Sequence, residues 1–390
     1  MKKFTHLIKR EFRLFFSNNV LRLLFIGAPI LYGILIGAVY QKGKITDLPI
    51  IVVDQDQSLM SVKFIDMLEE TESIQVVSVF PDLTNVKNKA IDEDASVIVN
   101  IPRGFTSGIQ QNKLPEITIF VDASNTLTSN TALMAVNGVA MTIKAGIQIE
   151  SQMKKGVPEY VATQNYEPFK TTIIKQSIRS GNYLYFMLPG VLLTVFQQIL
   201  LLGLALTFAS EYENRTFEEL VRKMPNPLGM LAVKIIPYMI MSVGILLLYW
   251  GFSKYYNMVI GGAFWAFSLS TFVFILAVCG IGVLVSIVLP NQLKATEVLM
   301  VVATPSFILS GFTWPLSQMP NWVQFIAELI PLTHYLKTFR ILYLNHASVS
   351  HIYAPVIAMS IIAVICLSLS AIILHYKIKK VKNHSTEEIN

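Results

Sequence analysis

One stretch of thirteen residues, Glu211 to Lys223 (EYENRTFEELVRK), is the only dense group of charged residues between Asn182 and the C-terminal tail. Opposite charges three or four residues apart on a helix pair with one another, and such a surface can also dock a groove of complementary charge. Because the stretch is too short to build a core of its own, we interpret it as a contact surface for another protein. The alternative is a solvated segment that pairs only with itself. Its charged residues are Glu211, Glu213, Arg215, Glu218, Glu219, Arg222 and Lys223.

The sequence offers no arrangement suited to catalysis. It contains no G-x-x-x-x-G-K-[ST] phosphate loop, no H-E-x-x-H zinc motif and no G-x-S-x-G nucleophile motif. The two cysteines, Cys279 and Cys366, lie inside apolar runs and have no metal-ligand spacing. We therefore predict no catalytic residue, no metal site and no nucleotide site in this chain.

Two acids and a serine, Asp54, Asp56 and Ser58, follow a short apolar run early in the chain. The end of a strand is where α/β domains often bind ligands, so a cation site is one interpretation. Turn and helix-cap chemistry accounts for the same three residues, and this is the interpretation that the sequence favours.

Composition indicates a membrane protein. Hydrophobic residues make up 53% of the chain and charged residues 14%, whereas soluble domains have roughly 25% charged residues. A bilayer core needs about 20 apolar residues per helix, and six runs are long enough or nearly so. These predicted spans are Leu21–Tyr40, Tyr183–Ala209, Met230–Phe252, Gly262–Leu289, Val298–Phe312 and Tyr353–Tyr376.

We predict a tight turn at Pro290–Lys294 between the fourth and fifth of these spans, with Glu297 at the edge of the fifth. No acid is then expected in the interior of any span. Carriers driven by ion gradients usually need such an acid near the middle of the membrane. Energy for transport would therefore have to come from another polypeptide.

The distribution of charge predicts the orientation. Residues 1–40 hold six Lys and Arg residues against one acid, and the tail holds Lys377, Lys379, Lys380 and Lys382. Basic segments beside spans stay in the cytoplasm, so both termini are predicted to be cytoplasmic. Residues 1–20 have the spacing of a basic amphipathic helix that lies at the membrane surface. The excess of basic residues therefore reflects topology, and we predict no nucleic acid partner.

Residues 41–180 differ from the rest in pattern. Short β-type runs, each followed by a polar or helix-permissive stretch, suggest an α/β domain outside the cytoplasm. A long helix is predicted at Asn125–Lys155 and a last strand at Asn165–Ile174. The other predicted strands are Pro49–Asp54, Ile74–Phe80, Ser96–Ile101 and Ile117–Asp122.

Prolines at 315, 320 and 331 interrupt the apolar segment from Gly311 to Arg340. Apolar pieces of about ten residues are typical of re-entrant or interfacial helices, which we predict over residues 314–345. Trp314, Trp322 and Tyr335 have the amphipathic rings expected at the level of the lipid headgroups.

The predicted fold class is thus an α-helical polytopic membrane protein. It has six transmembrane helices and an α/β extracytoplasmic domain inserted between the first and second. The predicted parts are the interfacial helix 1–20, the first span 21–40, the extracytoplasmic domain 41–180 and a five-helix region 181–390. That last region contains a cytoplasmic loop at 211–229 and the broken helices at 314–345.

At this point the chain resembles a known family. EYENRTFEELVRKMP, Glu211 to Pro225, is similar to the inner-loop signature of the membrane subunits of type-2 ABC exporters. PLSQMPNWVQFIAELIPLTHYLKTFR, Pro315 to Arg340, is similar to a second block of the same family. The order of a leader helix, a span, a large outer domain and five more spans also matches. One difference is that Arg215 stands where that family usually has glycine.

The resemblance implies a permease subunit of an ATP-driven, multidrug-export-like transporter in the bacterial cytoplasmic (inner) membrane. Two such subunits, a second copy or a paralogue, would form a pathway for a hydrophobic or amphipathic cargo such as a drug, a lipid or a lipid-linked molecule. Cytoplasmic ABC ATPase subunits would hold ATP and magnesium, an adaptor protein on the outer side is a further candidate partner, and membrane lipid surrounds the spans. The implied contacts with the ATPase are Glu211, Glu213, Arg215, Thr216, Glu218 and Leu220.

For the pathway, the resemblance points to the second and fifth spans. Their candidate residues are Gln197, Gln198, Thr304, Ser306, Ser310 and Phe307. Polar groups in a span face a cavity or bond to neighbouring helices, and the residues alone leave both interpretations open. A different class of function also stays open: a membrane scaffold that transports nothing and displays its outer domain as a binding surface.

Overall fold

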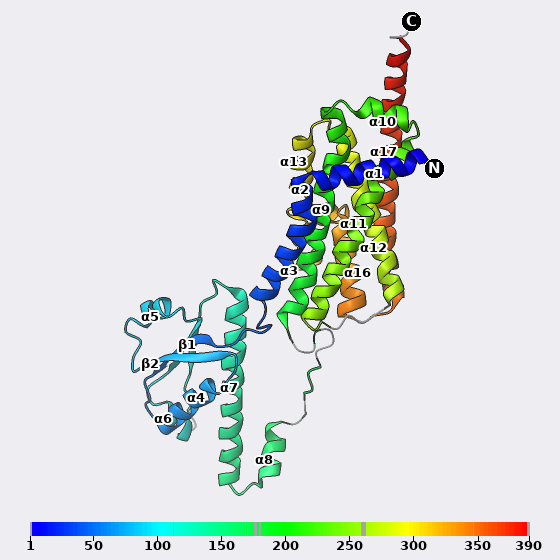
Figure 1. Ribbon diagram of the computed structural model, residues 1–390. Helices are drawn as coiled ribbons and strands as arrows, with labels where there is room; N and C mark the ends of the chain where they lie inside the picture. The colour runs from blue at the N-terminus through cyan, green and yellow to red at the C-terminus, as the bar shows by residue number, and fades with distance from the viewer. Residues whose placement is uncertain are drawn as a thin grey trace. The chain divides into compact units, whose positions relative to one another are not determined.

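The computed structural model describes residues 2–387 except 112, 168, 170, 175–177, 179–180, 259–262 and 346. The chain divides into two compact units (Figure 1). Residues 1–43 and 175–390 form the first, called here the helical unit. Residues 44–174 form the second, called the α/β unit.

The helical unit is assembled around α9 (Tyr183–Glu213), a helix in which 78% of the most apolar window is buried. The other helices are α1 (Lys2–Ser17), α2 (Asn19–Arg22), the π-helix η1 (Leu23–Gly27), α3 (Ala28–Val39), α10 (Phe217–Lys223), α11 (Pro227–Tyr255), α12 (Phe264–Val288), α13 (Gln292–Ala303), α14 (Ser306–Leu309), η2 (Leu316–Gln318), α15 (Asn321–Glu328), α16 (Pro331–Phe339), η3 (Arg340–Leu344), η4 (Val349–Ile352) and α17 (Tyr353–Glu387). Helix α9 contacts α3 near the N-terminus and α11, α12, α13 and α16 later in the chain, so the unit is built around it.

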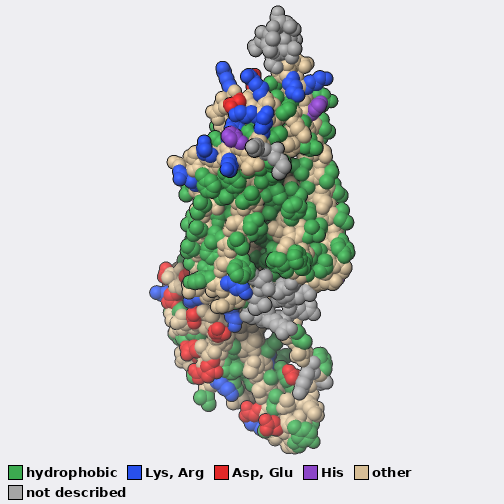
Figure 2. Space-filling model, turned by 45° about the vertical axis from the view of Figure 1, so that its right-hand side comes forward, with side chains coloured by type: hydrophobic (Ala, Val, Ile, Leu, Met, Phe, Trp, Pro, Cys, Tyr) green, Lys and Arg blue, Asp and Glu red, His purple; other side chains and the backbone are tan. Residues whose placement is uncertain are grey.

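Apolar side chains cover the flank of the helical unit in a continuous band, and Lys and Arg side chains gather at one end of it (Figure 2). Seven helices among the described residues are long and apolar enough to cross a membrane. Six of them belong to the helical unit, and the seventh is α7 (Thr126–Lys154) of the α/β unit. The chain is therefore mostly helical, as expected of a polytopic membrane protein.

Several helices extend beyond the spans predicted within them. The predicted second span ends at Ala209, but α9 runs on through Glu211 to Glu213. Likewise α11 begins at Pro227, where proline suits the first turn because its missing N–H has no partner there. The predicted start of the fourth span at Gly262 lies outside the described residues.

The predicted turn at Pro290–Lys294 is wrong in its second half. Asn291 caps α13 through its side chain, and the helix begins at Gln292. Glu297 therefore lies inside α13 rather than at its edge, where its side chain is exposed. The helix starts early because an N-cap residue stands ahead of the apolar run. Where α13 would enter a membrane does not follow from its first residue, so the absence of an acid from the interior of the spans stays a prediction.

The broken apolar segment forms η2, α15, α16 and η3, each beginning at or just after a proline or another helix end. Trp314 and Trp322 are exposed, as headgroup-level side chains would be. Tyr335 is fully buried, so its predicted headgroup position is wrong. Its ring stacks on Phe274 at a centroid distance of 4.2 Å and its hydroxyl bonds Thr271, which places it between α16 and α12.

The α/β unit contains a four-stranded sheet with the order β2-β1-β3-β4. β1 pairs in parallel with β2 and β3, and β4 runs antiparallel to β3. The four strands lie where the sequence predicted them, within one residue or so at each end. They are β1 (Leu48–Asp54), β2 (Ile74–Phe80), β3 (Val97–Ile101) and β4 (Thr118–Val121).

Alternate residues of these strands build two cores. On one face, Val52 and Val99 pack with Phe64 of α4 (Leu59–Glu69) and with Ala132 and Val136 of α7. The opposite face has a smaller core under α5 (Val86–Asp92). The remaining helices are α6 (Phe105–Gln110) and α8 (Glu159–Tyr166).

The predicted long helix at Asn125–Lys155 is present as α7. The predicted strand at Asn165–Ile174 is wrong for the part that is described, because residues 165–166 end α8 and 171–174 form no strand. Among the described residues, the sheet consists of β1 to β4 alone.

Candidate functional site

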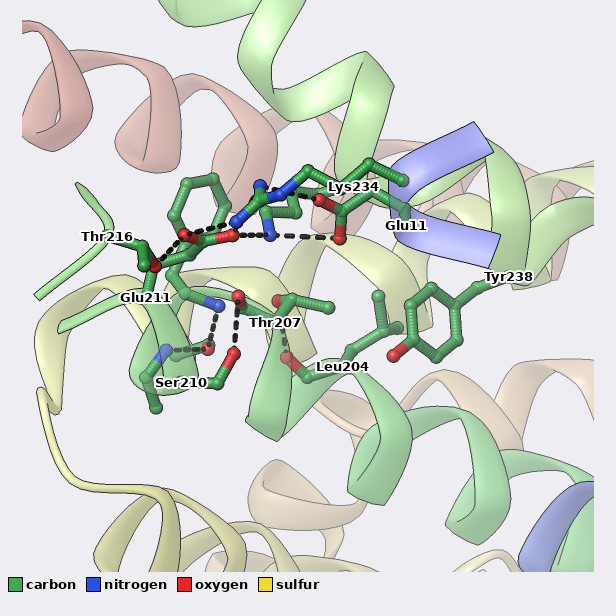
Figure 3. Close-up of polar contacts among 12 residues, drawn as sticks. Glu11, Leu204, Thr207, Ser210, Glu211, Thr216, Lys234 and Tyr238 are labelled. Atoms are coloured by element: carbon green, nitrogen blue, oxygen red, sulfur yellow. Dashed lines mark hydrogen bonds and ion pairs between the residues drawn. The ribbon is translucent and has the colours of Figure 1, made fainter. Parts of the chain in front are cut away.

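A cluster of four charges, three of them buried and the fourth, Arg10, partly exposed, joins helices α1, α9 and α11 (Figure 3). Glu211 of α9 and Lys234 of α11 are 2% and 1% exposed, and Lys234 Nζ lies 2.6 Å from Glu211 Oε1. The same ammonium group donates to Glu11 Oε2 of α1 at 2.9 Å. Arg10 Nη1 and Nη2 donate to the two oxygens of Glu211 at 2.9 and 3.0 Å.

Packing of apolar side chains brings these charged residues together. Leu7 and Phe15, on one face of α1, are buried, and Phe15 packs its ring edge against Phe25 and Tyr238. Residues 10 and 11 lie between them, so docking that face brings both charges against α9 and α11. Lys234 reaches the cluster with its ammonium group 5.8 Å from the centre of the Phe208 ring.

The cluster is electrically balanced, with two cations and two anions. Removing charges from water is costly unless each is paired and hydrogen-bonded. The bidentate contact from Arg10 is the strongest geometry for such a pair, and Thr216 Oγ1 also donates to Glu211. Although burial lowers the pKa of Arg10, the hydrogen bond and charge of Glu211 outweigh it and raise that pKa above its ordinary value.

Directly after the cluster, α9 ends in a turn that reverses the chain. Thr216 N donates to Glu211 O at 2.9 Å and Arg215 N donates to Tyr212 O at 3.2 Å. These two bonds define a Schellman motif, whose C′ residue adopts left-handed backbone angles and is usually glycine. Here that residue is Arg215, with φ +54°. The turn thus has the geometry that glycine favours, although an arginine occupies it.

The helix after this turn, α10, has one buried and one charged face. Phe217, Leu220 and Val221 are buried. On the exposed face, Glu218 pairs with Arg222 at 3.8 Å and Glu219 pairs with Lys223 at 2.5 Å. All four of these side chains are exposed.

The hydrogen bond and charge of Lys223 lower the pKa of Glu219 below its ordinary value. The carboxylate therefore stays ionised to a lower pH than an isolated glutamate.

The predicted contacts with an ATPase thus have different environments. Glu218 and Arg215 are exposed, whereas Leu220 and Glu211 are buried. Glu213 is exposed, but it accepts from both the backbone and the side-chain nitrogen of Gln292, at 2.9 and 2.5 Å. The surface formed by Arg215, Glu218, Glu219, Arg222 and Lys223 is called the α10 surface below.

The sequence pattern predicts a span that contains Lys234 and a basic amphipathic helix over residues 1–20, but it does not connect the two. Arg10 and Glu11 were counted only as part of a basic amphipathic helix. The available signal was a lone lysine inside an apolar run together with the single acid of the leader. Charges of this kind inside an apolar setting need partners.

The predicted pathway residues also separate into two sets. Gln197, Ser306 and Ser310 are buried and hydrogen-bonded within the chain. Thr304 is exposed, and Phe307 is partly buried against Phe312, at a ring-centroid distance of 5.9 Å. Gln198, partly buried, donates to Ala303 O at 3.4 Å.

The acidic group after β1 has the helix-cap role that the sequence favoured. Ser58 caps α4 in a reciprocal capping box with Ser61, and Ser61 Oγ donates to Asp54 Oδ2 at 2.7 Å. Asp56 accepts from the backbone and hydroxyl of Thr106. No group of three His, Cys, Asp or Glu side chains suited to a metal occurs within the described ranges.

Comparison with known proteins places these features in a wider group. Residues 21–372 match the family described as ABC-2 family transporter protein. The probable multidrug ABC transporter permease YbhR of Escherichia coli is 21% identical over 358 residues, which cover 89% of this chain and 91% of that one. YbhS of the same organism, also described as a probable multidrug ABC transporter permease, is 26% identical over 63% of this chain and 64% of its own. The linearmycin resistance permease protein LnrN of Bacillus subtilis is 23% identical over 85% of this chain and 88% of its own.

Proposed function

The chain belongs to the ABC-2 family of transporter proteins, and from this premise we propose that it is the permease subunit of an ATP-driven exporter. That it is a multi-pass transporter permease rather than an enzyme follows from the family and from its apolar helices. The source of energy, the assembly and the cargo are the parts that we propose.

The observation that carries the proposal is the joining of the α10 surface to the membrane helices. The opposite, buried face of helix α10 packs in the core of the helical unit. Just before α10, Glu211 holds α1, α9 and α11 together. A force applied to α10 would therefore act on three helices at once. A separate ATPase, holding ATP and magnesium, is the partner that we propose for this surface.

The proposed topology has six spans, with both termini and α10 in the cytoplasm. The gathering of Lys and Arg at one end of the helical unit supports this orientation, since basic residues stay on the cytoplasmic side (Figure 2). We do not count α7 as a span, because Ala132, Val136 and Val139 pack into the core of the α/β unit. That unit would then lie outside the cytoplasm.

We further propose that two permease subunits, identical or paralogous, enclose the pathway, and that the cargo is hydrophobic or amphipathic. Only 22% of the apolar window of α13 and α14 is buried within the chain, which leaves that face for lipid or for a second subunit. The names of the relatives refer to multidrug transport and linearmycin resistance. Both descriptions are compatible with such a cargo, and an adaptor on the outer side is a further proposed partner.

The test exchanges the charges of one exposed pair, Glu218→Arg with Arg222→Glu. This variant keeps an internal i,i+4 pair but reverses the charge at two positions of the α10 surface. We expect loss of the co-purifying ATPase in mild detergent and loss of ATPase activity from the purified material. The matched control exchanges the pair Glu150 and Lys154 in α7 and should retain both.

If the exchanged variant retains its ATPase, the α10 surface is not the coupling surface. If the wild type co-purifies with no ATPase in several detergents and in membranes, the exporter proposal fails. In that case a scaffold that transports nothing would be the better description.

A further inference from the structure

Gln197 lies halfway along α9 and is 1% exposed. It precedes Glu211 on the same helix by about 21 Å, at 1.5 Å per residue. α9 is unbroken between the two residues, so the charged cluster and Gln197 sit on one rigid element.

The nitrogen and the oxygen of the Gln197 side-chain amide each form a hydrogen bond with a residue that follows a helix break. Nε2 donates to Ser306 Oγ at 3.2 Å, and Oε1 accepts from Leu332 N at 3.1 Å. Ser306 is the first residue of α14, immediately after the break at Thr304 and Pro305. Leu332 is the second residue of α16, immediately after Pro331.

These two positions are where broken helices need partners. The first N–H groups of a helix have no acceptor within it, and Pro331 contributes none, so Leu332 N is the first donor of α16. A side chain of α9 supplies its acceptor. At the other break, the Ser306 hydroxyl accepts the hydrogen bond from Gln197 and donates one to Ala303 O at 2.5 Å. Non-helical backbone at membrane depth is tolerated when such contacts satisfy it.

We propose that Gln197 is a positioning residue that transmits movement of α9 to α13–α14 and to α16, and that it does not contact cargo. The inference rests on the proposed function, in which an ATPase moves the end of α9 that carries α10. Breaks are the points at which a helix bends most easily. A buried amide that holds two breaks to one rigid helix makes them move together.

Gln198 provides a matched comparison. It is adjacent and partly buried, and among the described residues it bonds only to Ala303 O, at 3.4 Å, a distance at which a hydrogen bond contributes little. If Gln197 acts through its two bonds, the neighbouring amide should be dispensable.

The first experiment measures hydrogen exchange of the whole permease without nucleotide. Gln197→Leu should raise the exchange rate of the Leu332 amide by about tenfold, the effect of losing one ordinary hydrogen bond. Ser306→Ala and Gln198→Leu should leave that amide unchanged. An unchanged Leu332 rate in Gln197→Leu overturns the bond on which the proposal depends, whatever the protein's function.

The second experiment repeats the measurement on the complex with its ATPase, with and without a non-hydrolysable ATP analogue. In the wild type we expect nucleotide to alter exchange in α10, α13–α14 and α16. Gln197→Leu should keep the change in α10 and lose both others, while Ser306→Ala should lose only the change in α13–α14. Gln198→Leu should behave as the wild type.

Two results separate the possible failures. If nucleotide changes all three segments in Gln197→Leu, the positioning role is wrong and the proposed function is unaffected. If nucleotide changes nothing in α10 of the wild type, the proposed coupling fails, and the positioning role fails with it as a step in transport. The first experiment still decides whether Gln197 holds the start of α16.

Discussion

Lys234 and Glu211 place opposite charges where water does not reach, and this determines what each substitution does. A buried pair contributes little net stability compared with a well-packed apolar pair, but breaking it leaves a charge without compensation. Arg10 and Glu11 complete the balance from the leader helix. The role that follows is to hold α1 in one register against α9 and α11.

We predict that Lys234→Met will destabilise the protein by about 3–5 kcal/mol, because it leaves two buried carboxylates with one guanidinium. Thermal unfolding in detergent would measure the loss. Lys254→Met, at the exposed end of the same helix, is the control and should change stability little.

Adding Glu211→Gln to Lys234→Met restores a balanced charge. The double variant should therefore be more stable than the sum of the single effects predicts, since residues in one network are not additive. Strict additivity would show that the four charges do not act as a unit.

Arg215 adopts a left-handed backbone conformation, which favours glycine. A left-handed backbone costs a residue with a Cβ about 1–2 kcal/mol relative to glycine. We therefore expect Arg215→Gly to raise the thermal midpoint of the purified protein. A lower midpoint would mean that the arginine side chain contributes more at the α10 surface than its backbone costs.

At the scale of elements, α10 combines a packed face with two exposed ion pairs. Its position is set by burial of Phe217, Leu220 and Val221 and by the turn before it, not by the exposed charges. Surface pairs contribute only about 0–1 kcal/mol. Those charges are therefore available to a partner at little cost to the fold.

The pair of Glu219 and Lys223 gives a prediction about pH. Lys223 lowers the pKa of Glu219 in the folded protein, so the contribution of this pair is present above the unfolded pKa of about 4.3. It is lost as the pH falls through the lower, folded value. Carboxyl NMR should show Glu219 titrating at higher pH in Lys223→Met than in the wild type.

Arg222→Met should leave the pH at which Glu219 titrates unchanged, because Arg222 pairs with Glu218 instead. Equal titration of Glu219 with and without Lys223 would show that the pair does not persist in solution.

At the scale of the whole molecule, the proposed topology can be tested directly. In a background with Cys279→Ala and Cys366→Ala, a cysteine at Asp82, an exposed residue of the α/β unit, should react with a membrane-impermeant maleimide in intact cells. Cysteines at Lys3 or Arg222 should react only after the cells are permeabilised. Reaction of all three in intact cells would overturn the orientation.

Local patterns determined much of this protein. The lengths of apolar runs placed the long helices of the helical unit, and alternation in residues 44–174 placed four strands within one residue or so at each end. Local spacing also predicted the i,i+4 charges of α10 and the capping role of Ser58. Each of these depends on residues only a few positions apart, and spacing along the chain reports such relations directly.

Tertiary structure alone decided which distant residues meet. Arg10 bonds Glu211 across 201 positions, and Gln197 bonds Leu332 across 135. The same packing buried Tyr335 and made Gln197 a link between helices. A helix-period pattern states that a side chain lies on a face, but not which helix that face meets. That choice follows from how all the helices fill the space around α9, which no single stretch of sequence encodes.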